Sequence, residues 1–494
     1  GCRKEAEQSA HDAAGGPQTT QPSSAAGLGS LLLAPEALFR PTRNGCTLQW
    51  IARVPCQTRV LAGPSPDALR EFQTVNSLGP AEVNIVGAAP DSDLFIKCEF
   101  RAQQGGDWIR QPLRRVRTQR RAGETFKAIL IADTHPYAAL HKPAGRENTL
   151  AAQQRIIAEQ PDFVIFLGDE ASMIRNIYRG RVVTAEEAAA DWLRWRTLYS
   201  DLLSQVPSMM VLGNHEGEAG YYQTYTNSNG VMYLQRWATV ARKQVLRNPG
   251  PTTYPEGGED EGWVGDPDSP ATGGAEQGNR SPLENYFAWT WGDALFVVLD
   301  VHRYTNPGGS TPAAPEEWTL GPTQMAWLEK TLRNSTARWK IVVTHHLVGG
   351  WRWDGGGHTQ ETKYYYGRGG AKYARVGEQA RITDLMNETG ARLLLYGHDH
   401  VFAHQQSDNV DFVCCGRVSY LNPEWFDRPG WREAYGDAAA RDPYDFYAAL
   451  GYVRLTISPN SIDLAYVCSG RDGASGENVD SQPGEVVYQR TFSA

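Results

Sequence analysis

Residues 208–216 read SMMVLGNHE, an apolar run that passes without a spacer into Gly213-Asn214-His215-Glu216. The run has the length of a buried strand, and turn chemistry gives no reason for His and Glu to follow Asn. A glycine before the polar residues permits a sharp turn and a close approach of backbone. The stretch therefore predicts a buried strand that delivers polar side chains to one edge of a sheet.

Four further apolar runs end in the same way. The polar groups that follow them are Asp133-Thr134-His135, Gly168-Asp169, His345-His346 and Gly397-His398-Asp399-His400. The buried strands are predicted at residues 126–132, 162–167, 208–212, 294–299, 340–344 and 392–396. Helical patterns lie between them at residues 149–159, 184–203, 323–333 and 378–389, the second beginning with a capping box of Thr184 and Glu187. This alternation predicts an α/β sandwich with its ligands at the carboxyl ends of the strands.

These polar groups have the chemistry of metal ligands. A carboxylate and an imidazole two residues apart, as in Asp133 and His135, can converge on one cation where a strand ends in a bend. His398 and His400 repeat this spacing. Mixed oxygen and nitrogen ligands suit Zn, Mn or Fe better than Ca or Mg, and Asp169 can bridge two ions. Each group alone could be a turn, a helix cap or a core histidine, but the five together predict a dinuclear metal site.

The order of the five groups, D-x-H, G-D, G-N-H-[DE], H and G-H-x-H, resembles the calcineurin-like metallophosphoesterases over residues 126–494. The resemblance implies a four-layer α/β/β/α sandwich that holds two divalent or trivalent metal ions, Fe, Zn or Mn. Its first ligand set is Asp133, His135, Asp169 and His400, and its second is Asp169, Asn214, His345 and His398. It makes His215 the catalytic acid, with Glu216 or Asp169 orienting it, and places His346 just behind the ligands, near the substrate.

Residues 31–121 read as short strands separated by turn residues, at 47–54, 58–62, 81–86, 94–101 and 113–118. This pattern predicts a small all-β sandwich ahead of the catalytic domain at residues 122–494. Its order and position resemble the fibronectin-like domain that precedes the catalytic domain in purple acid phosphatases. Within the catalytic domain, the segments 285–287 and 291–293 also resemble those enzymes. Two departures stand out: Ser172 replaces the iron-binding tyrosine of purple enzymes, and His135 is a residue that they lack. We therefore expect their architecture with a colourless metal site.

Two stretches, residues 248–284 and 349–370, have neither the strand nor the helix period and are predicted to be long loops. Loops of this length inside a domain often carry substrate contacts. The second contains Arg352 and His358, which we expect to contact the substrate. The alternative is a solvated surface loop.

Residues 1–30 contain few large apolar side chains and are predicted to form a flexible tether. Cys2 at its start resembles the mature start of a bacterial lipoprotein, and the alternative is an exposed cysteine in a disordered tail. A lipidated Cys2 would anchor an exported protein in the periplasm or at the cell surface. In an exported protein Cys46, Cys56 and Cys98 could supply one disulfide, with the pairing open.

The formal net charge of −8 argues against a nucleic-acid binder, whereas metal ions could attract a small phosphorylated substrate. The predicted activity is hydrolysis of phosphate monoesters, as in acid phosphatases, by a metal-bridging hydroxide, with His215 protonating the leaving group. One alternative is a phosphodiesterase acting on nucleotides or glycerophosphodiesters. Another is a surface binding module with a degenerate metal domain. A structural zinc protein is disfavoured because such sites are usually rich in thiolates.

Overall fold

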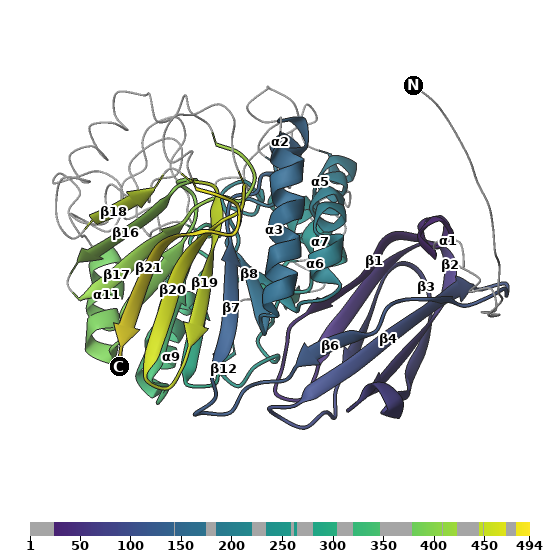
Figure 1. The fold of residues 1–494 in the computed structure, drawn as a ribbon, viewed down its shortest axis with the longest axis horizontal. Coiled ribbons are helices and arrows are strands. Elements are labelled where there is room, and N and C mark those ends of the chain that lie inside the picture. The colour runs from purple at the N-terminus through teal and green to yellow at the C-terminus, as the bar shows by residue number, and fades with distance from the viewer. Residues whose placement is uncertain are drawn as a thin grey trace, which may run out of the picture.

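The computed structural model describes residues 24–142, 144–173, 184–219, 234–257, 261–263, 280–303, 320–345, 378–407, 409–421, 444–447, 449–470 and 481–494. Two β-sheets lie face to face between helices, and a unit made mainly of strands lies beside them at the N-terminal end (Figure 1). Among the described helices, none is long and apolar enough to cross a membrane.

The first central sheet contains three parallel strands, β7 (Phe126–Ile131), β8 (Phe163–Phe166) and β9 (Ser208–Met210). Three antiparallel strands extend it beyond β7: β19 (Gly451–Ile457), β20 (Ser461–Cys468) and β21 (Val486–Ser493). In β7, Ala128 and Leu130 face the core between the two sheets, while Ile129 and Ile131 face the outer helices. Because successive residues point to opposite faces and both faces are covered, the strand reads as a continuous apolar run.

The second sheet has the order β12-β13-β14-β15-β17-β16-β18. Its parallel strands are β13 (Ala294–Val298), β14 (Trp339–Val343), β15 (Leu393–Tyr396) and β17 (Val410–Cys415). Its antiparallel strands are β12 (Phe287–Trp291), β16 (Phe402–Ser407) and β18 (Tyr444–Tyr447).

Helices cover the outer face of each sheet. The first sheet is covered by α3 (Gly145–Glu159), α5 (Ala185–Leu198), α6 (Ser200–Leu203) and α7 (Leu234–Val245). The second is covered by α9 (Pro322–Asn334) and α11 (Glu378–Thr389). The predicted four-layer α/β/β/α sandwich is therefore confirmed (Figure 1).

Several elements differ from the sequence prediction. The capping box of Thr184 and Glu187 is present, but the predicted helix 184–203 breaks at Tyr199, which is not helical. The short helix α2 (Pro136–His141) and helix α7 were not predicted. The stretch 248–284 is not entirely loop, because β10 (Glu261–Trp263) pairs with β11 (Arg280–Pro282) within it. The predicted loop 349–370 lies outside the described residues.

The N-terminal unit has its own hydrophobic core, which includes Trp50 and Phe100. Its elements are α1 (Ser24–Leu31), β1 (Leu32–Phe39), β2 (Cys46–Gly63), the 3-10 helix η1 (Pro66–Ala68), β3 (Arg70–Ile85), β4 (Asp93–Ala102), β5 (Ile109–Arg110) and β6 (Arg114–Arg117). The predicted strands 47–54 and 58–62 are one long strand, β2, which pairs with β1 in its first half and with β4 in its second. The likeness of this unit to a fibronectin domain stays a prediction.

Two further expectations for the N-terminal residues differ from the structure. Helix α1 begins at Ser24, inside the predicted tether, and the side chain of Leu28 packs against the core of the unit. Cys46, Cys56 and Cys98 are buried free thiols, so the three do not form the disulfide that was considered. Burial raises the pKa of the Cys46 thiol to about 12.

The N-terminal unit and the first sheet form one continuous hydrogen-bonded sheet, because β1 runs parallel to β9 at Phe39 and Ser208. The side chain of Arg196, fully buried in α5, ties the two parts together. Its guanidinium donates to the backbone oxygens of Pro35, Gln49 and Val245 and to Oε1 of Gln49, at 2.5–3.0 Å. The junction is therefore a packed and hydrogen-bonded interface.

We predict that Arg196→Ala lowers the free energy of unfolding by about 3 kcal/mol, because two buried carbonyl groups and a part-buried one lose their donor. Chemical denaturation followed by circular dichroism measures this change. Thr197→Ala is the matched control on the same helix, since the exposed Thr197 hydroxyl bonds within the helix, to the backbone oxygen of Leu193, and should contribute less than about 0.5 kcal/mol. Equal losses for the two variants would contradict the assigned role of Arg196.

Candidate metal centre

The predicted ligands meet because the parallel strands of both sheets end at the same edge of the sandwich. The turns after these strands contain Gly168, Gly213 and Gly397, where any side chain would clash. A Cβ at Gly213 would lie 2.3 Å from Oδ1 of Asp169, and one at Gly397 would lie 2.6 Å from Oδ2 of Asp133. The close approach expected at these glycines is thus present.

Two groups of side chains gather at this edge, each with ligand atoms within 4.8 Å of one another. The first is Asp133, His135, Asp169 and His400, and the second is Asp169, His345 and His398. Two ligands of one Zn, Mn or Fe ion lie about 3–4.4 Å apart, since each bond is ~2.0–2.2 Å long. Both groups therefore have the spacing of metal sites, and Asp169 belongs to both.

Asn214 lies beside the second group. Its Oδ1 is 3.0 Å from Nε2 of His345, and that nitrogen is 3.3 Å from Oδ2 of Asp169. The other ring nitrogen of His345 lies 2.7 Å from the backbone oxygen of Leu167, which orients the ring. Such a contact on the far side of the ring is typical of metal-binding histidines. The structure thus brings together all seven residues of the two predicted ligand sets.

The backbone at these ligands is strained. Asp133, His135, Asp169, His398 and His400 all have positive φ, between 45° and 74°. This left-handed conformation is uncommon for residues with a side chain, and it persists only where the surroundings enforce it. The strain at five of the ligands indicates a functional centre, because an ordinary turn would use glycine or asparagine at these positions.

The electrostatics of the site favour a bound cation. Burial raises the pKa of Asp133, whose fully buried Oδ1 accepts no hydrogen bond from the part of the chain that the structure describes. Burial also opposes ionisation of Asp169, but the charges of His215 and His345 hold the pKa of its carboxyl well below the usual range. Burial lowers the pKa of His135 and His400, which keeps these rings neutral and able to bind metal. The mixed oxygen and nitrogen donors therefore fit two ions such as Fe, Zn or Mn.

His215 is directly beside the ligands. Its Nε2 lies 3.8 Å from Oδ2 of Asp169, and its ring contacts that of His135 at 4.6 Å. A quarter of its side chain is exposed, whereas Asp169 is 1% exposed. Burial lowers the pKa of His215.

Glu216 makes contacts that the sequence did not indicate. Its carboxylate accepts hydrogen bonds from four backbone N–H groups, those of Asp169, Glu170, Ala171 and Gly213, at 2.5–3.1 Å. It is fully buried, and burial raises its pKa to about 7. The carboxylate thus holds the turn after β8 against the turn after β9.

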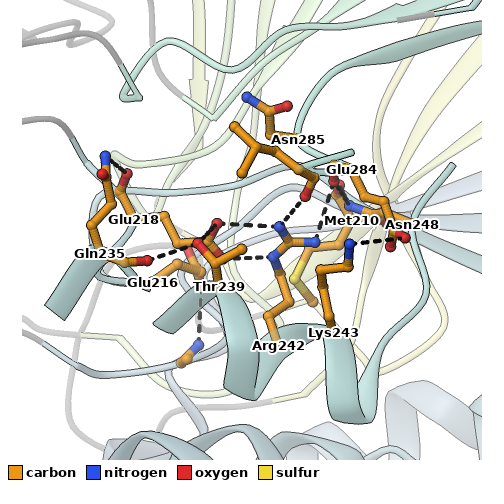
Figure 2. Close-up of polar contacts among 12 residues, drawn as sticks. Met210, Glu216, Glu218, Gln235, Thr239, Arg242, Lys243, Asn248, Glu284 and Asn285 are labelled. Carbon is orange, nitrogen blue, oxygen red and sulfur yellow. Dashed lines mark hydrogen bonds and ion pairs between the residues drawn. The ribbon is translucent and has the colours of Figure 1, made fainter. Parts of the chain in front are cut away.

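A buried ion pair lies just after the turn that contains Asn214, His215 and Glu216 (Figure 2). The guanidinium of Arg242, on α7, contacts both carboxylate oxygens of Glu218 at 2.6 and 3.1 Å and donates to the backbone oxygens of Leu283 and Glu284. Thr239 donates to the same carboxylate at 2.8 Å. Figure 2 shows Arg242 between the 216–218 turn and the segment around Glu284. The pair therefore connects the Asn-His-Glu turn to the helix and to the start of the second sheet.

Other residues of the centre escaped the sequence analysis. Glu170 is fully buried next to Asp169 and accepts the N–H of Thr134. His302, after β13, packs its ring against His345 at 5.8 Å. Arg417, after β17, reaches a ring nitrogen of His400. A signal was present for all three, since each closely follows a buried strand, but nothing in the local sequence indicates which side chain each one contacts.

The predicted substrate residues His346, Arg352 and His358 and the lipidation site Cys2 lie outside the described residues. Ser172, where purple enzymes have a tyrosine, is buried two residues after Glu170.

The family model for the calcineurin-like phosphoesterases matches residues 126–402, more than half of the chain. The chain belongs to this family. It is therefore a metal-dependent phosphoesterase, with a cluster of His and Asp side chains suited to two metal ions. No curated protein is significantly similar to it in sequence.

Two solved structures share the fold of this phosphoesterase. The first is "Structure of PhoD", with a TM-score of 0.62, 12% identity, and coverage of 94% of this chain and 92% of that one. The second is the purple acid phosphatase PPD1 from yellow lupin (Lupinus luteus) seeds, with a TM-score of 0.57, 15% identity, and coverage of 93% and 74%. The architecture is thus that of the purple acid phosphatases, as the sequence predicted, with an N-terminal β unit included in the match.

We predict that the purified phosphoesterase contains about two metal ions per chain, measured by inductively coupled plasma mass spectrometry. Asp169→Ala should lose both ions, because its carboxylate belongs to both groups of ligands. Asn214→Ala should lose one of the two, since Asn214 lies beside the second group only. Unchanged metal content in both variants would mean that the ions bind elsewhere.

Proposed function

We propose that this chain is a phosphomonoesterase that uses two metal ions, with Asp133, His135, Asp169 and His400 holding one and Asp169, Asn214, His345 and His398 the other. The observation that supports this most directly is the single carboxylate shared by two groups of donors, with a partly exposed histidine beside it. When bound, the ions would supply positive charge to the phosphoryl oxygens and lower the pKa of a water molecule that attacks phosphorus.

His215 is the proposed general acid. A group that protonates the leaving alkoxide must be reachable by the substrate and close to the reacting centre. Nε2 of His215 meets both conditions, since it is 3.8 Å from Asp169 while a quarter of the side chain is exposed. The Asp169 carboxylate stabilises the protonated ring, because an opposite charge at this distance favours the charged form.

Glu216 is proposed as a positioning residue. Both of its carboxylate oxygens accept backbone hydrogen bonds at the turns that carry Asp169 and Asn214. It fixes the bridging carboxylate and the amide ligand relative to each other, and Asp169 orients His215. The expected contacts of Arg352, His358 and His346 with the substrate remain part of the proposal.

The proposed substrate is a small phosphorylated molecule, and the net charge of −8 disfavours nucleic acid.

We also propose that the protein is exported and that lipidation of Cys2 anchors it to a membrane. Residues 31–121 and 122–494 are the two proposed folded domains. The binding-module alternative has little support, because all seven ligand positions are occupied by ligand residues.

Hydrolysis of 4-nitrophenyl phosphate and bis(4-nitrophenyl) phosphate tests the activity, with protein loaded separately with Mn, Zn or Fe. We expect faster turnover of the monoester, and Asp169→Ala should reduce it to background. Faster turnover of the diester would assign a phosphodiesterase. No turnover of either ester by fully loaded protein would refute the proposed activity.

We predict that His215→Ala lowers kcat about 100-fold or more for an ester with a poor leaving group, such as an alkyl phosphate. The loss should be much smaller for a nitrophenyl ester, because nitrophenolate leaves without protonation. Metal content should stay near the wild-type value, since His215 is in neither group of ligands. An equal loss for both esters would argue against a general-acid role.

A further inference from the structure

Arg417 is a buried cation at the edge of the first group of ligands. It follows strand β17, and only 1% of it is exposed. Its Nε donates to the backbone oxygen of Asp133 at 2.7 Å, and its Nη1 lies 3.4 Å from that of Tyr420. The ring of Tyr420 packs against the guanidinium, with the ring centroid 4.3 Å from Cζ. The side chain is therefore held in one position.

The remaining nitrogen of this guanidinium, Nη2, is 2.8 Å from Nε2 of His400. An arginine nitrogen can only donate, so Nε2 of His400 is the acceptor and offers its lone pair to Arg417. The same Nε2 is the ring nitrogen that faces the other ligands, at 3.5 Å from Oδ1 of Asp133 and 3.2 Å from Nε2 of His135. It is therefore also the atom that a metal ion in the first group of ligands would take.

One lone pair cannot serve both a metal ion and a hydrogen bond. When the ion takes Nε2 of His400, Nη2 of Arg417 loses its acceptor while the guanidinium remains charged and buried. A buried charged donor without an acceptor is costly, so the loaded centre favours an anion that can accept this hydrogen bond. Tetrahedral phosphate oxygens are among the best acceptors for a guanidinium.

We propose that Arg417 binds an oxygen of the phosphoryl group and that this donor is released only when a metal ion occupies the Asp133, His135, Asp169 and His400 site. Metal binding and phosphate binding are then coupled through a single nitrogen of His400. This inference rests on the proposed function for the metal site, but it concerns phosphate binding and does not require turnover.

The coupling is tested by titrating inorganic phosphate calorimetrically into metal-loaded and chelator-treated protein, for wild type and Arg417→Gln. In the loaded protein we expect phosphate to bind about 10- to 100-fold more weakly to the variant. In the metal-free protein the two should differ by less than about 3-fold, because Nη2 is then engaged by His400. Arg110→Gln, whose side chain is 69% exposed in the N-terminal unit, is the matched control and should behave as wild type.

A measurement of metal affinity distinguishes two possible roles of Arg417, which are binding phosphate and holding the metal ligands in place. Without phosphate, Arg417→Gln should bind the metal as tightly as wild type or more tightly, because a competing donor and a repelling charge are removed. A loss of metal affinity as large as the loss of phosphate affinity would overturn the proposal, as would equal phosphate affinity in the loaded proteins.

Circular dichroism and the melting temperature show whether Arg417→Gln folds. If it does not fold, Arg417→Lys is the second variant to test. Lysine keeps the charge but lacks the planar fork, so phosphate should bind at least about 5-fold more weakly to the loaded variant. Unchanged affinity in this variant would also overturn the proposal. Because phosphate binding is measured without an ester, the inference can hold even if no substrate is hydrolysed, and ester hydrolysis can occur even if Arg417 has no role.

Discussion

The buried carboxylate of Asp169 is the constraint around which this centre is built. It is 1% exposed and lies 3.3–3.8 Å from ring nitrogens of His135, His215 and His345. A charge in this position is stable only with cations beside it and a backbone that cannot move away. Metal ions at the two groups of donors would meet the first need, and the Glu216 carboxylate, which accepts hydrogen bonds from four N–H groups of the flanking turns, meets the second.

Both sheets contribute residues to the candidate metal centre. The first contributes Asp133, Asp169 and Asn214 from the ends of β7, β8 and β9, while the second contributes the histidines that follow β14 and β15. The apolar layer between the sheets therefore fixes the distance between the two halves of the site. The N-terminal unit adds to this frame, because β1 pairs with β9 and Arg196 joins both parts.

The sequence reveals features that depend on neighbours along the chain. The strand ends and the capping box of Thr184 are of this kind, and so are the glycines that allow close approach. It does not reveal partners that are far apart, such as Arg242 with Glu218 or Arg417 with His400. Three cysteines in one unit suggested a disulfide, but their thiols are buried and free. The interruption of the predicted helix at Tyr199 was not expected, because the apolar pattern continues across it.

By itself, the sequence determined the family and the strands that carry the predicted metal ligands, because each group of predicted ligands directly follows an apolar run. It did not predict α2, α7 or the strands after β15. Only the tertiary structure decided what those ligands touch. Glu216 accepts hydrogen bonds from the backbone rather than from His215, and Arg417 directly contacts His400, which lies 17 positions earlier in the chain. The physical reason is that hydrogen bonds and charges act over a few ångströms in space, while the spacing of residues along a chain records only the repeat of a strand or a helix.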